Sequence, residues 1–204
     1  MTVFDRIILL ATGLVAIYLL WRFWGRYNAK KGLYDLYYIT GFAVLLVAGL
    51  LLIFLGYDIL ASPWVLTVSS LIPLNISMGI AEQYFPAWKK AFKWFALLGF
   101  LAIAVTSLGG LAGPKKIAVP LFHGVAGLVI VLGPLFAPGA TTGLRWVSLG
   151  GVLIGLGGIA LAFLALGSQL LFFSQSFVLT ILAPLLLAMM LAFAYGFVKD
   201  ILRK

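Results

Sequence analysis

The sequence contains no cysteine, a single histidine and only five acidic residues in 204 positions. Without cysteine the chain cannot form disulfides, thiolate nucleophiles or zinc–thiolate sites. The lone histidine and the scattered acids also give no pattern of nucleophile with base, paired carboxylates or metal ligands. We therefore expect a protein that is not an enzyme, and we predict no catalytic residue and no metal site.

Charge is scarce as well. Only 9% of the residues are charged and 64% are hydrophobic, whereas soluble domains are about 25% charged and about 45–50% apolar. The apolar runs reach the roughly 20 residues that cross a bilayer, and they alternate too little for barrel strands. We predict an all-α polytopic transmembrane helical bundle, a single integral membrane domain over residues 1–204. Seven spans are predicted at 3–22, 34–56, 62–82, 91–111, 117–136, 146–167 and 177–198.

The distribution of lysine and arginine predicts the orientation, because cytoplasmic loops carry an excess of positive charge. With the N-terminus outside and the C-terminus in the cytoplasm, three of these residues fall outside, namely Arg6, Lys115 and Lys116. The other eleven fall inside: Arg22, Arg26, Lys30, Lys31, Lys89, Lys90, Lys93, Arg145, Lys199, Arg203 and Lys204. We expect an integral protein of a prokaryotic cytoplasmic membrane.

The second inner loop interleaves aromatic and basic side chains, which are Trp88, Lys89, Lys90, Lys93 and Trp94. On a short helix, rings of this kind dip into the membrane while ammonium groups reach its anionic surface. This pattern predicts contact with anionic lipid. The basic residues cluster beside apolar spans, so membrane lipids are the expected partners and nucleic acid is not.

The third span places polar groups deep in an apolar segment. Pro73 lacks an N–H group and so frees the carbonyl of Ser69, and Asn75 adds donors and acceptors at similar depth. Ser70 and Ser77 share one helical face. These residues could bind a small polar solute or an ion. The alternative is that Asn75 bonds a neighbouring helix and the proline only bends the span.

Glu82 lies at the inner end of the same span, beside Lys89 and Lys90. A buried acid in a membrane could couple proton or cation movement. At a span boundary it is more simply interpreted as a solvated or paired interface residue. Asp35 and Asp58 also lie at span edges and are given less weight.

His123 lies a few residues inside the outer end of the fifth span. It could ligate haem iron, donate a hydrogen bond to a quinone carbonyl or act at a structural interface. Ligation of haem by two histidines within the chain is impossible, so a methionine (Met78, Met189 or Met190) or another subunit would have to supply the second ligand. No cofactor is predicted, and haem or quinone at His123 remains an alternative.

Small residues recur at spacings of three and four in the last two spans, at Gly151, Gly155 and Gly158 and at Ala188 and Ala192. Such faces let helices approach closely, either within the chain or with a partner. Buried polar groups are few. The preferred prediction is therefore a non-enzymatic accessory or scaffold subunit of a larger membrane assembly, bound to other subunits or to copies of itself.

Two other functions remain open. The first is a transporter or channel for a small or largely apolar solute or an ion, with its site on the third span. The second is a redox subunit that binds quinone or haem through His123. We recognise no family motif in the sequence.

Overall fold

The computed structural model describes residues 1–165 and 174–203, and over these residues the chain is helical and contains no strand. This confirms the predicted all-α class. The α-helices are α1 (Val3–Lys30), α2 (Leu33–Leu55), α3 (Pro63–Ser69), α4 (Leu71–Tyr84), α5 (Lys89–Leu108), α6 (Ala112–Phe136), α7 (Arg145–Ala165) and α8 (Gln175–Arg203). Two short 3₁₀ helices, η1 (Tyr57–Ala61) and η2 (Thr142–Leu144), lie in the connections.

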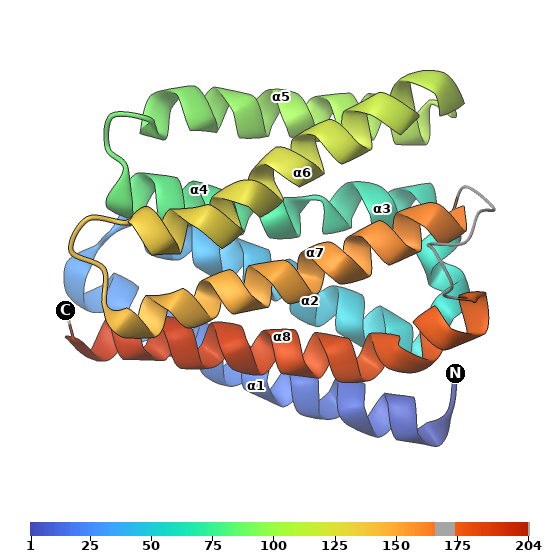
Figure 1. The fold of residues 1–204 in the computed structure, drawn as a ribbon, viewed down its shortest axis with the longest axis horizontal. Helices are drawn as coiled ribbons and strands as arrows, with labels where there is room; N and C mark the ends of the chain where they lie inside the picture. Colours follow the sequence, from blue (N-terminus) through green and yellow to red (C-terminus); the bar gives the residue numbers. More distant parts are fainter. Residues whose placement is uncertain (166–173, 204) are drawn as a thin grey trace.

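Within the described residues, six helical segments are long and apolar enough to cross a membrane, with α3 and α4 counted together as one segment. The chain is therefore built as an integral membrane protein. Helix α7 corresponds to the predicted span 146–167 and lies between α6 and α8 (Figure 1). The count of seven spans and the orientation of the termini remain predictions.

Helix α6 begins at Ala112 rather than residue 117. Two helices continue well past the C-terminal ends of their predicted spans. Helix α1 runs to Lys30 rather than residue 22, and α8 runs to Arg203 rather than residue 198. The predicted spans ended where charged residues began. Both extensions carry a charged residue, Arg26 and Asp200, that is buried in the bundle. Because these two charges meet each other, the helices can continue past the apolar stretch without exposing them.

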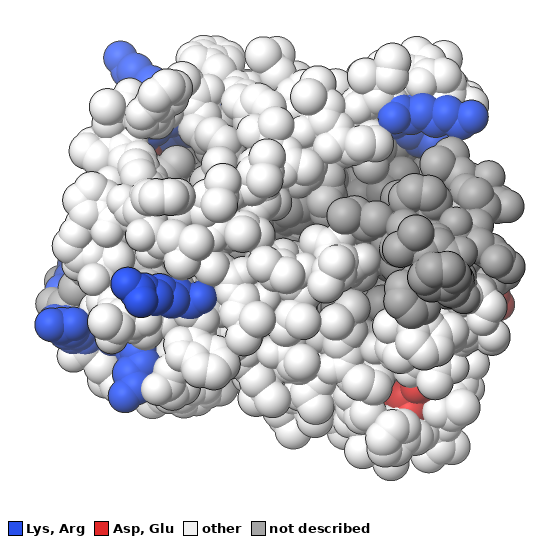
Figure 2. Space-filling model, viewed as in Figure 1, with Lys and Arg blue, Asp and Glu red and all other residues white. Residues whose placement is uncertain are grey.

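The helices lie side by side with α5 at one edge and α1 at the other, and α6 crosses obliquely between them (Figure 1). One end of the bundle, which we call the basic end, carries Lys30, Lys89, Arg145, Lys199 and Arg203. Figure 2 shows Lys and Arg at both ends of the visible face, with largely uncharged surface between them. By the positive-inside rule, the basic end is the predicted cytoplasmic end.

Five aromatic side chains fill the interior near the basic end: Phe23, Tyr38, Phe42, Phe193 and Phe197. Each is at most 1% exposed. The ring centroids of Phe23 and Tyr38 are 4.9 Å apart, and those of Tyr38 and Phe197 are 4.7 Å apart. This aromatic cluster joins α1, α2 and α8. Rings at such separations attract each other beyond their burial of surface, by about 0.5–1.5 kcal/mol per pair.

Helix α4 approaches this cluster closely because Gly79 has no side chain. A Cβ atom at Gly79 would overlap the ring of Tyr38 on α2. The third span itself is interrupted between α3 and α4, at Ser70. Pro73 cannot donate to the carbonyl of Ser69, and the next bond, from Leu74 N to Ser70 O, is long at 3.4 Å. The interruption divides the span near its middle.

Candidate functional site

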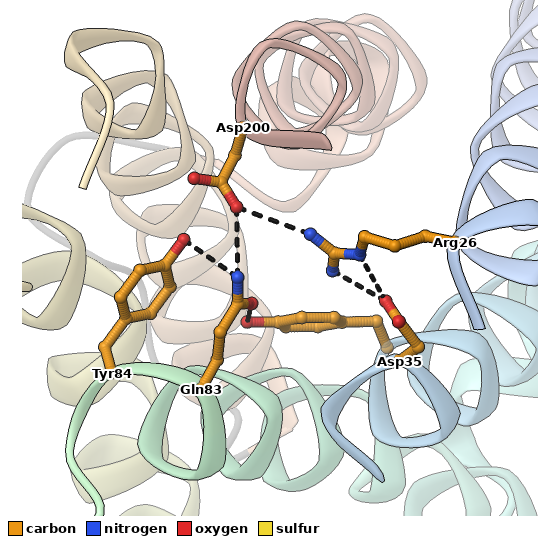
Figure 3. Close-up of polar contacts among 6 residues, drawn as sticks. Arg26, Asp35, Gln83, Tyr84 and Asp200 are labelled. Atoms are coloured by element: carbon orange, nitrogen blue, oxygen red, sulfur yellow. Dashed lines mark hydrogen bonds and ion pairs between the residues drawn. The ribbon is translucent and has the colours of Figure 1, made fainter. Parts of the chain in front are cut away.

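A buried ion-pair network lies at the basic end (Figure 3). The Nε group of Arg26 donates to Asp35 Oδ1 at 2.7 Å, and its Nη2 atom lies 2.6 Å from the same oxygen. The Nη1 group donates to Asp200 Oδ2 at 3.4 Å. Arg26 is 6% exposed, and both aspartates are 0% exposed. One guanidinium group therefore joins α1, α2 and α8.

Helix α4 is joined to the same network through Gln83. The Oε1 atom of Gln83 accepts a hydrogen bond from the hydroxyl of Tyr38 at 3.0 Å. Its Nε2 group donates to Asp200 Oδ2 and to the hydroxyl oxygen of Tyr84, each at 3.1 Å. The guanidinium carbon of Arg26 also lies 5.0 Å from the ring centroid of Tyr34. Four helices are thus fastened together by polar contacts directly beside the aromatic cluster.

This network joins four helices by polar contacts. In the described part of the chain, no three His, Cys, Asp or Glu residues gather as metal ligands would. A buried pair of ions contributes little net stability compared with apolar residues, but removal of one partner typically costs about 3–5 kcal/mol. The network is therefore costly to break by removal of one partner, although its net contribution to stability is small. We call these residues, Arg26, Asp35, Gln83 and Asp200, the polar latch.

Two adjoining cavities lie in the other half of the bundle. A cavity of about 150 Å³ lies where α3, α4, α6, α7 and α8 meet. Its lining includes Ser69, Ile72, Pro73, His123 and Leu182. An engineered apolar cavity of about 150 Å³ stays dry and binds benzene or xenon. This cavity is therefore large enough to hold a small apolar group.

A second cavity of about 220 Å³ adjoins the first and extends between α1, α2 and α8. Six residues line both cavities: Ser69, Ile72, Ile154, Leu182, Leu186 and Met189. The lining of the second cavity also includes Leu10 and Leu14 of α1, which are 55% and 61% exposed at the surface of the bundle. The two cavities together thus extend from the middle of the bundle to its lipid-facing side.

The polar side chains predicted for a third-span site are turned toward their own helix. Ser70 donates to the carbonyl of Thr67 at 2.7 Å, and Asn75 donates to that of Leu71 at 2.8 Å. Ser77 donates to the carbonyl of Pro73 at 2.6 Å. Of the four predicted residues, only Pro73 lines either cavity. The part of the third span that lines the first cavity is instead Ser69, Ile72 and Pro73.

Glu82 is paired, as its simpler interpretation predicted. Its carboxylate lies 2.8 Å from the Nζ atom of Lys93 and 3.6 Å from that of Lys89. Lys90 is exposed beside them. Trp88 and Trp94 are 69% and 65% exposed. The start of α5 therefore presents rings and ammonium groups outward, and contact with anionic lipid remains a prediction.

The small residues of α7 and α8 pack largely within the chain. A Cβ atom at Gly151 would lie 2.9 Å from Ile130 on α6, and one at Gly158 would lie 3.8 Å from the Nε2 atom of His123. Ala192 is buried, and Gly155 has no neighbour within 4 Å of its Cβ position. Ala188 is exposed. Most of this small-residue pattern is thus explained by close packing of α6, α7 and α8 of the same chain.

Sequence reasoning missed the polar latch, because Asp35 was given little weight as a span-edge residue and Arg26 was counted as a loop charge. Asp200 carried a usable signal. An acid in the last turn of a helix is disfavoured by the helix dipole, so a buried basic partner was to be expected. The long-range pairing of Arg26 with Asp200 has no local pattern. No family model, curated protein or solved structure matches this chain, and its function is therefore inferred from its own residues.

Proposed function

We propose that this protein is a non-enzymatic membrane carrier that binds an uncharged, largely apolar small molecule inside its helical bundle. The observation that carries the proposal is the uneven filling of the interior. One half contains two adjoining cavities. The other half is filled by the aromatic cluster and fastened by the polar latch.

The cavity lining selects the class of solute. Among the described residues, no lysine, arginine, aspartate or glutamate lines either cavity, and the polar side chains there are those of Thr12, Ser69 and His123. A charged solute would lose its hydration without gaining a counter-ion, which is strongly unfavourable in an apolar medium. An uncharged solute with an apolar body carries no such cost and reaches the cavities through the lipid.

In a carrier of this kind, the polar latch would keep the basic end of the bundle closed. Alternating access requires a binding site that opens to one side while the other side is closed. Arg26, Asp35 and Asp200 hold α1, α2 and α8 together at the basic end, and Gln83 adds α4. Opening this end would require these contacts to separate, so the latch sets the free-energy cost of the opposite state.

The proposal is tested with two variants of neighbouring residues on α8. Leu182 lines both cavities and is 4% exposed, whereas Ile181 is 38% exposed. Leu182→Trp should fill the cavity, and Ile181→Trp should only add a ring to the outer surface. The two variants therefore lie on the same helix at nearly the same depth, and each replaces a branched aliphatic residue by tryptophan.

The measurement is native mass spectrometry of each protein released gently from its own membrane. We expect the native chain and Ile181→Trp to retain a small apolar molecule and Leu182→Trp to lose it. Retention of the same molecule by all three proteins, or by none of them, would contradict the proposed function. Stoichiometric partner chains in the same spectra would favour the accessory-subunit prediction instead.

A further inference from the structure

His123 is a polar side chain in an apolar surrounding. It lies on α6 and faces the first cavity, close to Gly158 of α7. Its ring nitrogens make no hydrogen bond with any other described residue of the chain. A neutral imidazole ring carries one donor and one acceptor, and an apolar cavity offers neither of them the partner that water would supply. A ligand in the cavity could supply the missing partner.

Two glycines of α7 form the part of the cavity wall beside the imidazole. Gly157 and Gly158 line the cavity together, and a Cβ atom at Gly158 would already lie 3.8 Å from His123 Nε2. The remaining lining is mainly aliphatic, including Ile72, Leu153 and Leu182. A Cβ atom at Gly157 would lie 3.0 Å from Leu185 Cδ2, so the space beside the imidazole is narrow and fits a flat group better than a branched one. The head of the ligand is therefore expected to be planar.

The second cavity gives such a ligand room for a tail. It continues from the first through Ile154 and Leu186 and reaches the exposed Leu10 and Leu14 of α1. Every side chain that these two cavities share is aliphatic or a thioether, apart from Ser69. A long apolar chain can thus lie between α1, α2 and α8 and continue into lipid.

We propose that the two cavities hold one uncharged isoprenoid quinone, with a ring carbonyl accepting a hydrogen bond from His123 and the isoprenoid tail in the second cavity. This inference rests on the proposed function, since it names the class of apolar molecule bound. A carboxylate lipid fits less well, because no lysine or arginine of the described ranges lines either cavity. The proposal concerns binding and includes no electron transfer.

The test uses two uncharged probes in nanodiscs, decylubiquinone and decylbenzene, which share a six-membered ring and a decyl tail. Only decylubiquinone has ring carbonyl groups; it also carries methoxy and methyl groups, so the role of the carbonyl is read from the His123 variants. Three proteins are compared: the native chain, His123→Phe and His123→Gln. Phenylalanine keeps a planar ring without a donor, and glutamine keeps a donor without the ring. The dissociation constant of each probe is measured with each of the three proteins. Infrared spectroscopy follows the carbonyl stretch of bound decylubiquinone.

We expect His123→Phe to weaken decylubiquinone binding by about tenfold, the effect of one lost hydrogen bond, and His123→Gln to restore part of it. Decylbenzene should bind all three proteins alike. The carbonyl stretch should lie at lower frequency in the native chain than in His123→Phe.

Equal binding of decylubiquinone to all three proteins, with no shift of the carbonyl stretch, would overturn the quinone inference and leave the proposed function standing. If neither probe binds the native chain more tightly than Leu182→Trp, both the inference and the proposed function fail.

Discussion

Replacement of Arg26 by methionine should open the basic end of the bundle. Methionine preserves much of the apolar stem but removes the contacts to Asp35 at 2.6–2.7 Å and to Asp200 at 3.4 Å. Both aspartates are 0% exposed, so the variant leaves two carboxylates buried without their common counter-ion. Loss of one partner of a buried ion pair costs about 3–5 kcal/mol. This is a large share of the stability of a typical protein.

Amide hydrogen exchange in nanodiscs measures the opening directly, because exchange of buried amides requires local separation of helices. A cost of about 3 kcal/mol corresponds to about a hundredfold faster exchange. We expect this acceleration in the segments that carry the latch, at the start of α2 and the end of α8. The segments that line the cavities should change less, since they make no contact with Arg26.

Arg22→Met serves as the control. Arg22 lies one turn earlier on α1, and in the described structure it contacts the ring of Trp21, at 5.8 Å from the ring centroid, and forms no ion pair. This variant should leave exchange at the basic end near the native rate. Equal exchange rates in Arg26→Met and Arg22→Met would refute the reasoning, because the latch would then contribute nothing to closure. A triple variant that also replaces both aspartates by asparagine should recover part of the lost protection.

Three further predictions concern other parts of the chain. Gly79→Ala should lower the free energy of unfolding by about 1–3 kcal/mol, because the added methyl group overlaps the adjacent tyrosine ring. Gly124→Ala places its methyl group in open space and should leave the free energy of unfolding unchanged. Thermal unfolding of the two variants measures the difference. Burial, and secondly a nearby aspartate, raises the pKa of Tyr57 from 10.0 to about 12. The unfolded chain thus releases this proton at lower pH, so stability should fall as pH rises from about 10 to 12, and Tyr57→Phe should reduce that fall in alkaline unfolding titrations. Because the chain has no cysteine, the single-cysteine variants Lys90→Cys and Lys116→Cys report the orientation of the chain in the membrane. A membrane-impermeant maleimide should label position 116 from outside intact cells and position 90 only after lysis. The reverse pattern would show that the predicted topology is inverted.

The sequence was sufficient to predict the helical membrane class and most helix positions, because long apolar runs and the need to satisfy backbone groups leave few alternatives. It also indicated that Pro73 would free the carbonyl of Ser69 in the third span. The directions of Ser70, Asn75 and Ser77 could not be predicted. Each side chain can bond its own helix or a neighbour, and the choice depends on how the helices are rotated.

The polar latch was beyond sequence reasoning for a different reason. Arg26 and Asp200 are separated by most of the chain, and nothing local in the sequence relates them. His123 was identified as a notable residue, yet its proximity to Gly157 and Gly158 depends on the crossing of α6 over α7. Cavities depend on the same packing. Such features follow from three-dimensional arrangement rather than from periodicity.

The most direct test of the account is the location of xenon in crystals of the protein held under xenon pressure. Xenon enters apolar cavities of about 150 Å³ and is excluded from close-packed interiors. We predict xenon beside Ile72 and Leu182, where the two cavities meet, and none among Phe23, Tyr38 and Phe197. Xenon within the aromatic cluster, or none beside Leu182, would contradict a bundle that is hollow in one half and closed in the other.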